Sequence, residues 1–230
     1  MKEQVKNFWS DRAKNENVVR LESQVNFISD AETAQLYIDA ETEVINRELL
    51  LNINDMVVDL GAGNGRWSFL LAPKVDKVIA VEYIKEFTKA IESQAKERGL
   101  NNIETVNLSS EEFVKDSFAD ILFISGLFNY LDETQYEKTI SNITRTIKKG
   151  GILFMRETIS ILDDEYIVDK FSEELGTHYW SLYRTAARHI EEFTKNGFIL
   201  QKYAPFFEDG SILNKRLETR LHYFVFRMES

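Results

Sequence analysis

The sequence predicts a single α/β domain with a doubly wound, mostly parallel sheet, and three observations lead to this fold class. Helix-like stretches separate short apolar runs, which occupy residues 56–60, 77–82, 103–108, 119–125 and 151–157. Near-continuous apolar strands are typical of parallel sheets that are covered on both faces. Right-handed crossovers through the intervening helices, at about 65–72, 84–98 and 133–149, then give a doubly wound sheet. Only two prolines and no Gly/Ser-rich linker interrupt the 230 residues, which favours one domain.

The two ends of the chain follow other patterns. Residues 1–50 place apolar side chains on roughly one stripe, which predicts helices before the first strand. The rhythm breaks at residues 158–183, which are aromatic and acidic without a clear period. Thr185 as N-cap and Gly197 just past the C-terminus then frame a helix. Two strands close the chain, and the alternation over residues 218–227 suits an antiparallel strand.

Composition excludes several classes of protein. The chain is 43% hydrophobic and 29% charged, which is ordinary for a globular protein and argues against a mostly disordered one. Without cysteine and with only 3 histidines, it has no disulfide, thiolate site or cysteine nucleophile, and we expect no metal. The net charge of −10 disfavours nucleic acid as a partner. No apolar run approaches the roughly 20 residues of a membrane helix, and the charged N-terminus resembles no signal peptide, so we expect no membrane partner and a cytoplasmic location.

The most specific local pattern is the glycine-rich segment VVDLGAGNGRW at residues 57–67. A strand ends at Leu60, and Gly61, Gly63 and Gly65 then alternate before a helix begins. Glycine lets a ligand approach the backbone and the helix N-terminus offers free N–H groups, so the segment predicts a ligand-binding turn. A dinucleotide fingerprint needs G-x-G-x-x-G, and a phosphate loop needs Lys followed by Ser or Thr after its last glycine. The spacing G-x-G-x-G fits neither.

A second signal lies at the end of the next strand. Glu82 closes the apolar run KVIAVE. In doubly wound sheets, an acidic residue at the tip of the second strand can accept hydrogen bonds from both ribose hydroxyls of an adenosine. Glu82 therefore predicts a contact to such a ribose.

Five segments together resemble the superfamily of class I S-adenosylmethionine-dependent methyltransferases, in its small-molecule type. They are VVDLGAGNGR, VIAVE, NLSSEEF, FADILFISGLFNYL and KKGGILFMRET, and they cover about residues 50–157. The resemblance implies a Rossmann-like sheet of seven strands in the order 3-2-1-4-5-7-6, with the last strand antiparallel and an N-terminal helical lid. It also implies S-adenosyl-L-methionine as the cofactor and S-adenosyl-L-homocysteine as its product.

The resemblance also divides the single methyltransferase domain over residues 1–230 into four parts. They are the lid and substrate segment 1–50, the cofactor-binding half 51–157, the substrate-cap insertion 158–189 and the C-terminal strands 190–230. The cap follows the fifth strand, where this superfamily places its substrate loops.

Cofactor contacts are implied residue by residue. The glycine-rich loop approaches the methionine part, Arg66 the carboxylate, Glu82 the ribose and Tyr83 the adenine face. The motif at the adenine edge often begins with Asp; here it begins with Ser109, so the adenine amine is held by Ser109 Oγ, by a carbonyl or by Glu111. The implied cofactor-binding set is Trp9, Asp59, Gly61, Ala62, Gly63, Gly65, Arg66, Glu82, Tyr83, Ser109, Ser110, Glu111 and Ser125.

Residues near the methyl acceptor are predicted from their positions. Tyr130 falls where many members have a His or an aromatic residue, and we take Tyr130 and His178 as candidate catalytic residues. Arg184 precedes Thr185, so its charge and the free N–H groups of the next helix would converge on an anion. The candidate acceptor-binding set is Tyr130, Arg156, Tyr179, Tyr183 and Arg184. A general base is needed for a hydroxyl or an ammonium acceptor, whereas an already ionised oxygen needs none.

The sequence therefore predicts an enzyme that methylates an oxygen or nitrogen of a small polar, anionic metabolite. One alternative is an α-N-terminal peptide or protein amine methyltransferase, whose C-terminal layout the chain loosely shares. Another is a non-catalytic relative that only binds the cofactor. The motif Asn/Asp-Pro-Pro-Tyr, used to methylate amino groups of bases, is replaced by SGLFNY. The acceptor, the atom methylated, the number of methyl groups, the use of a base and the oligomeric state stay open.

Overall fold

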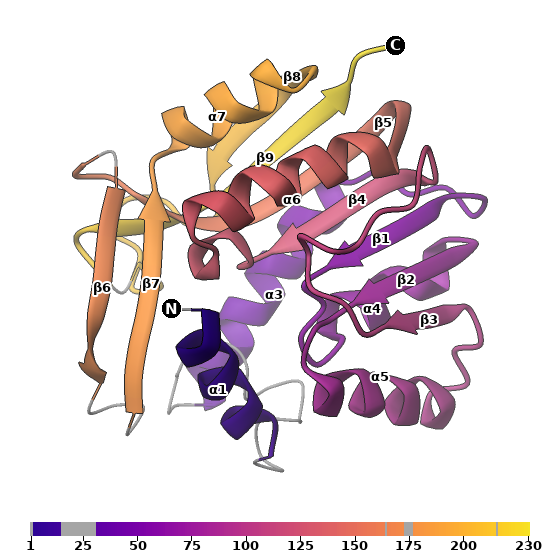
Figure 1. Ribbon diagram of the computed structural model, residues 1–230, viewed down its shortest axis with the longest axis horizontal. Helices are drawn as coiled ribbons and strands as arrows, with labels where there is room; N and C mark the ends of the chain where they lie inside the picture. The colour runs from indigo at the N-terminus through magenta and orange to yellow at the C-terminus, as the bar shows by residue number, and fades with distance from the viewer. Residues whose placement is uncertain (1, 15–30, 164, 173–176, 215) are drawn as a thin grey trace.

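A computed structural model describes residues 2–14, 31–163, 165–172, 177–214 and 216–230. Its centre is a seven-stranded sheet in the order β3-β2-β1-β4-β5-β9-β8 (Figure 1). The strands are β1 (Met56–Leu60), β2 (Lys77–Val81), β3 (Ile103–Val106), β4 (Ala119–Ser125), β5 (Ile147–Ser160), β8 (Phe198–Pro205) and β9 (Thr219–Met228). β9 is antiparallel to both β5 and β8, and the other neighbours pair in parallel. The predicted seven-stranded, mostly parallel sheet with an antiparallel last strand is confirmed.

Helices cover both faces of this sheet. One face carries α3 (Ala31–Glu48), α4 (Arg66–Leu71), the short η1 (Ala72–Lys74) and α5 (Lys85–Glu97), and the other carries α6 (Glu133–Thr146) and α7 (Ala186–Lys195) (Figure 1). Successive strand residues point to opposite faces, so Val57 packs with α3 and α4 while Val58 packs with α6. Both are fully buried, which explains the continuous apolar run. Within the described ranges, no helix is long and apolar enough to cross a lipid bilayer.

The helix predicted over 133–149 ends earlier than expected. Asp132 caps its start, accepting from the Gln135 backbone N–H at 3.0 Å, as the sequence pattern of a capping box requires. Its end comes at Thr146, because Ile147 is extended (φ −75°, ψ 142°) and pairs with Ala119 of β4. Residues 147–149, which were expected to continue the helix, therefore belong to β5.

The expected cap at 158–189 contains an antiparallel hairpin, β6 (Glu165–Ser172) and β7 (Thr177–Arg184), which the sequence did not predict. The hairpin stands beside the sheet, and α1 (Lys2–Ala13) lies between β7 and α5 (Figure 1). Phe8 of α1 packs on Tyr179 with ring centroids 5.8 Å apart, and Ala13 packs with Phe87 of α5. Helix α1 and the hairpin thereby close over the carboxyl ends of the parallel strands.

Candidate functional site

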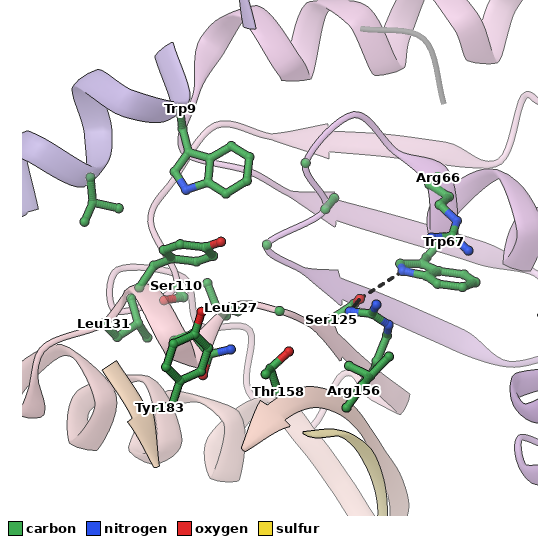
Figure 2. A pocket seen from close by; sticks show the side chains of 18 of the residues that line it. Trp9, Arg66, Trp67, Ser110, Ser125, Leu127, Leu131, Arg156, Thr158 and Tyr183 are labelled. Carbon is green, nitrogen blue, oxygen red and sulfur yellow. Dashed lines mark hydrogen bonds between the residues drawn. The ribbon is translucent and has the colours of Figure 1, made fainter. Parts of the chain in front are cut away.

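A pocket with a volume of about 330 Å³ lies at the carboxyl ends of the parallel strands, beneath α1 and β7. This is the edge at which doubly wound sheets bind their ligands. Figure 2 shows Trp9 on one side of the pocket, with Arg66 and Arg156 on another. The predicted site residues that line it are Trp9, Gly61, Ala62, Gly63, Arg66, Glu82, Tyr83, Ser109, Ser110, Glu111, Ser125, Tyr130, Arg156, Tyr179 and Tyr183.

The glycine-rich loop forms the floor of this pocket. Gly61 and Gly63 adopt left-handed conformations (φ 80° and 56°), which favour glycine. A Cβ atom on Gly61 would lie 3.1 Å from Cδ1 of Leu127, in the turn after β4. Gly65 has a different role, because a Cβ there would lie 2.8 Å from Ile91, and it does not line the pocket. Gly65 therefore serves close packing of α4 on α5, and the structure places it outside the pocket in which its cofactor contact was predicted.

Glu82 ties this loop to the end of β2. Its carboxylate accepts hydrogen bonds from the backbone N–H of Gly63 at 2.9 Å and of Ile84 at 2.8 Å. Glu82 is only 5% exposed, and burial raises its pKa to about 7. The buried carboxylate therefore faces the pocket from a position that also holds the glycine loop.

Asp59 was predicted to contact the cofactor, but the structure places it beneath the loop. It is fully buried, accepts a hydrogen bond from Ser68 Oγ at 2.6 Å and does not line the pocket. Burial raises its pKa to about 6. Asp59 joins β1 to α4 and supports the loop from behind.

The predicted adenine edge forms a polar wall. Ser109 Oγ donates to Glu112 at 2.6 Å, so its hydroxyl hydrogen is already used within the turn. Ser110 Oγ bonds Thr139 at 2.9 Å, and Gln135 Nε2 donates to Glu111 at 3.0 Å. All three alternatives for the adenine amine stay open, because Ser109 Oγ keeps its lone pairs for accepting after it has donated its hydrogen to Glu112.

A buried ion cluster lies behind the opposite wall. Glu41 of α3 is fully buried and pairs with both Arg66, at 2.7 Å, and Arg156, whose Nε donates at 2.6 Å. Arg156 also reaches Ser125 Oγ at 3.4 Å, and Trp67 Nε1 donates to the same oxygen at 3.0 Å (Figure 2). Two cations sharing one carboxylate leave a net positive charge at this wall. No local pattern marks Glu41 as part of the site, because it comes from the distant helix α3.

An aromatic wall closes the pocket above the end of β4. Trp9 meets Tyr130 edge to face with ring centroids 5.2 Å apart, and Tyr130 meets Tyr179 in the same way at 6.4 Å. The hydroxyls of Tyr179 and Tyr183 bond at 3.0 Å. Burial raises the pKa of Tyr130, so its phenol stays protonated at neutral pH. In this form the Tyr130 hydroxyl can donate or accept a hydrogen bond.

The segment 213–221 adds a basic end to the pocket. Arg216 and Arg220 both line it; Arg216 lies 3.4 Å from the Tyr183 hydroxyl, and Arg220 donates to the carbonyl oxygens of Arg216 and Thr219. Within the described part of the chain, Arg216 has no carboxylate within salt-bridge distance. The acidic side chains of the lining, Glu82 and Glu111, belong to the other end. The pocket therefore separates opposite charges.

Two predicted acceptor residues lie outside this pocket. Arg184 is fully buried, and its guanidinium donates to the carbonyls of Phe128 at 3.0 Å and Leu131 at 3.1 Å and to Glu133 at 3.1 Å. His178 is half exposed beside Asp169, at 3.3 Å. Neither lines the pocket, because alternation along β7 turns Tyr179 and Tyr183 toward it and the even-numbered residues away. The structure therefore places Arg184 and His178 away from the pocket in which they were predicted to act.

The turn after β4 was only partly recognised from the sequence. It includes η2 (Phe128–Tyr130), and Leu127, Asn129 and Leu131 all line the pocket. Glu157, fully buried at the end of β5, accepts from the backbone N–H groups of Leu127 at 2.7 Å and Phe128 at 2.9 Å. Burial raises the pKa of Glu157 to about 7. A strand-end Glu carries no local signal that it clamps a turn 30 residues away.

Glu157→Gln should remove a pH dependence of stability. Because the folded-state pKa is raised above the ordinary value of 4.5, the contribution of Glu157 is fully present below pH 4.5 and is lost as pH rises through about 7. The amide can still accept from the turn but cannot ionise. We expect the variant to gain up to about 3 kcal/mol relative to the parent between pH 5 and pH 8.

Urea unfolding at both pH values measures this gain, with Glu137→Gln on the exposed face of α6 as the matched control. Parallel stability curves for the parent and Glu157→Gln would show that Glu157 titrates as an ordinary carboxyl.

Comparisons with known proteins agree with this geometry. A family model described as a methyltransferase domain matches residues 57–151. Phosphoethanolamine N-methyltransferase 1 of Triticum aestivum is 34% identical over 104 residues, which are 44% of this chain and 21% of that protein. The chain thus matches about a fifth of the length of this protein and of other phosphoethanolamine N-methyltransferases similar to it.

Two solved structures share the fold. Phosphoethanolamine N-methyltransferase 1 of Haemonchus contortus, in complex with phosphoethanolamine and S-adenosylhomocysteine, superposes with a TM-score of 0.72 at 18% identity, covering 100% of this chain and 49% of that one. The N-methyltransferase NodS of Bradyrhizobium japonicum, in complex with S-adenosyl-l-homocysteine, has a TM-score of 0.67 at 13% identity, covering 99% and 100%. The fold is that of class I methyltransferases.

Proposed function

We propose that this chain, which carries a class I methyltransferase domain, transfers a methyl group from S-adenosylmethionine to the amine nitrogen of a small molecule that also bears a phosphate or similar anion. The observation that carries the proposal is the separation of charge within one pocket. Glu82 and Glu111 lie at the end predicted for adenosine, whereas Arg216 and Arg220 line the end left for the acceptor.

The cofactor end fits S-adenosylmethionine. Gly61 and Gly63 give the loop that lines the pocket its left-handed turns, and the buried Glu82 carboxylate is placed to accept from a ribose. Tyr83 and Glu111 would flank the adenine, and Arg66 would meet the carboxylate of the methionine part. When bound, the cofactor would supply a methyl carbon activated by a sulfonium. The acceptor ammonium first loses a proton to solvent. Its nitrogen lone pair then forms the C–N bond while the electron pair of the C–S bond returns to sulfur.

The acceptor end supports an anion. Arg220 Nε is buried without a hydrogen-bond partner, and Asp209, the acid nearest to it at 3.8 Å, is fully exposed. Arg216 lines this end as well, although the chain carries a net charge of −10. Concentrated positive charge inside an acidic protein suits a phosphate or carboxylate. A peptide amine, by contrast, would be favoured by a long acidic groove.

The aromatic wall supports a nitrogen as the methylated atom. The ring faces and edges of Trp9, Tyr130 and Tyr179 surround the space beside the turn after β4. Aromatic faces attract ammonium groups and the positive charge that develops on a nitrogen under methylation. The curated relatives include phosphoethanolamine N-methyltransferases, whose named substrate combines an amine with a phosphate.

Label transfer from S-adenosylmethionine with a radioactive methyl group tests the proposal. We expect phosphoethanolamine to be methylated at least about tenfold faster than ethanolamine, which lacks the anion, or glycerol 3-phosphate, which lacks the amine, since one charge-assisted hydrogen bond is worth roughly 1.5–3 kcal/mol. Equal label in glycerol 3-phosphate would contradict nitrogen methylation. Cofactor binding without any label transfer would favour the non-catalytic alternative, and faster transfer to a peptide α-amine would favour the peptide alternative.

Arg216→Ala should raise the KM for the phosphate-bearing acceptor about tenfold or more, because it removes a charge-assisted hydrogen bond. Cofactor affinity should change less than about twofold, and Arg216→Lys should recover only part of the loss because lysine lacks the planar fork. Initial rates and calorimetry measure the two effects. Arg227→Ala is the matched control, since Arg227 is exposed on β9 outside the pocket lining. An unchanged KM in Arg216→Ala would show that Arg216 does not bind the anionic group of the acceptor.

A further inference from the structure

The ends of β4 and β5 form a wall of the pocket that is rich in hydrogen-bond donors (Figure 2). Ser125 closes β4, Arg156 is its neighbour on β5, and both line the pocket. Ser125 Oγ accepts hydrogen bonds from Trp67 Nε1 at 3.0 Å and from Arg156 Nη1 at 3.4 Å. A hydroxyl has two lone pairs and one hydrogen, so these two donors leave the hydrogen of Ser125 for a ligand.

A carboxylate on the far side orients the guanidinium of Arg156. Its Nε and Nη2 both donate to Oε1 of Glu41, a fully buried residue of α3. Nη1 is the remaining nitrogen, and it lies beside Ser125. A Cβ on Gly126, which also lines the pocket, would lie 3.8 Å from this Nη1. The Arg156 side chain is 10% exposed and Glu41 is not exposed at all, so the guanidinium meets the pocket through Nη1.

The charges around this wall do not cancel. Glu41 also pairs with Arg66 at 2.7 Å, so one carboxylate serves two guanidinium groups. Glu157 follows Arg156 on β5, but it is directed to two backbone N–H groups of the turn after β4. Tyr37 of α3 also lines the pocket, and burial raises its pKa, so its phenol stays protonated. A group that only accepts hydrogen bonds and carries a negative charge would balance this wall.

This wall adjoins the glycine-rich loop. Arg66, its second cation, opens α4 directly after the loop. Leu127, in the turn after β4, lies 3.1 Å from the position that a Cβ of Gly61 would take. Arg220 of the basic end pairs instead with Ile159, farther along β5. The excess positive charge of the wall is therefore on the side of the pocket that holds the loop.

Resting on the proposed use of S-adenosylmethionine, we infer that Arg156 Nη1 and the Ser125 hydroxyl bind the carboxylate of the cofactor beside Arg66 and select a cofactor that carries this group. A carboxylate accepts hydrogen bonds and cannot donate them, and its single charge equals the excess of the wall. Glu41 fixes the guanidinium before the ligand arrives, so little reorganisation is needed on binding. This assignment moves Arg156 from the acceptor, where its sequence position placed it, to the cofactor.

Calorimetry with two cofactor products tests the inference without turnover. The probes are S-adenosylhomocysteine and its decarboxylated form, which keeps the adenosine, the sulfur and the amine. We expect the parent protein to bind S-adenosylhomocysteine at least about a hundredfold more tightly, because the decarboxylated form loses two charge-assisted hydrogen bonds. Arg156→Met and Ser125→Ala should each lower the affinity for S-adenosylhomocysteine about tenfold or more. Affinity for the decarboxylated form should change less than about threefold in both variants.

Arg227→Ala, at the exposed position on β9, is the control and should bind both probes as the parent does. A parent that binds the two probes equally, or equal losses of both probes in Arg156→Met and Ser125→Ala, would overturn the inference. So would an Arg156→Met protein that loses phosphoethanolamine, measured with saturating S-adenosylhomocysteine, while its affinity for S-adenosylhomocysteine is unchanged.

Failure of the parent to bind S-adenosylhomocysteine at all would instead contradict the proposed function. Thermal unfolding shows whether each variant is folded. If Arg156→Met does not fold, Ser125→Ala decides, because it leaves the ion pairs of Glu41 in place.

Discussion

Glu82→Ala is expected to weaken the affinity for S-adenosylmethionine at least about a hundredfold. The carboxylate would lose the proposed bonds to the ribose, each worth roughly 1.5–3 kcal/mol when charge-assisted. It would also release the Gly63 N–H, so the glycine loop would lose the tie that holds it to the end of β2. Loss of a ligand contact and loss of loop order act in the same direction. Titration calorimetry with S-adenosylmethionine or S-adenosylhomocysteine measures the change.

Two further variants separate these contributions. Glu82→Gln can keep the bond from Gly63 but loses the charge, so its affinity should fall between those of the parent and the alanine variant. Glu86→Ala, four residues on at an exposed position of α5, should bind as the parent does. If Glu82→Ala changed the affinity for S-adenosylmethionine less than about twofold, Glu82 would be only a charge at the end of a strand, and it would not contact the ribose.

Arg184→Ala is expected to lower the stability of the fold by about 3–5 kcal/mol, the cost of removing one partner from a buried ionic contact. The guanidinium is fully buried, lies 4.1 Å over the ring of Tyr136 and holds two carbonyls of the turn after β4. Alanine would leave those carbonyls without donors. For a domain of this size the melting temperature should fall by on the order of 10 °C, which thermal unfolding followed by circular dichroism measures.

Arg188→Ala is the matched control for this prediction. Arg188 pairs with the same Glu133 but is partly exposed, so its removal should cost about 1 kcal/mol or less. A melting temperature for Arg184→Ala equal to that of Arg188→Ala, together with a higher KM for the acceptor, would contradict the structural role and restore the contact first predicted from the sequence.

Local sequence patterns were sufficient to predict the strands and the glycine-rich turn in the βαβ half of the molecule. Buried parallel strands read as continuous apolar runs, and glycines at alternate positions marked the turn after β1. Glu82 and Ser125 could be located because each ends a strand at the same edge of the sheet. For these residues the period of the strand and the position of its end already determine which side chain reaches the pocket.

The acceptor side could not be predicted in the same way. Both Tyr183 and Arg184 of β7 are buried, so the hairpin shows no polar alternation that would reveal which face meets the pocket. Sequence proximity to a helix N-terminus favoured Arg184, but the strand turns it away toward α6. Arg156 pairs with Glu41, 115 positions away, and no local pattern records such a contact. Arg216 and Arg220 enter the pocket only because the antiparallel β9 returns beside β5.

A crystal structure of the protein with S-adenosylhomocysteine and phosphoethanolamine tests the central claim most directly. We expect the ribose hydroxyls within hydrogen-bond distance of Glu82, the phosphate on Arg216 or Arg220, and the amine facing the sulfur. A phosphate bound away from all the arginines of the lining, or an amine turned from the sulfur toward solvent, would contradict the division of the pocket into a cofactor end and an anionic acceptor end.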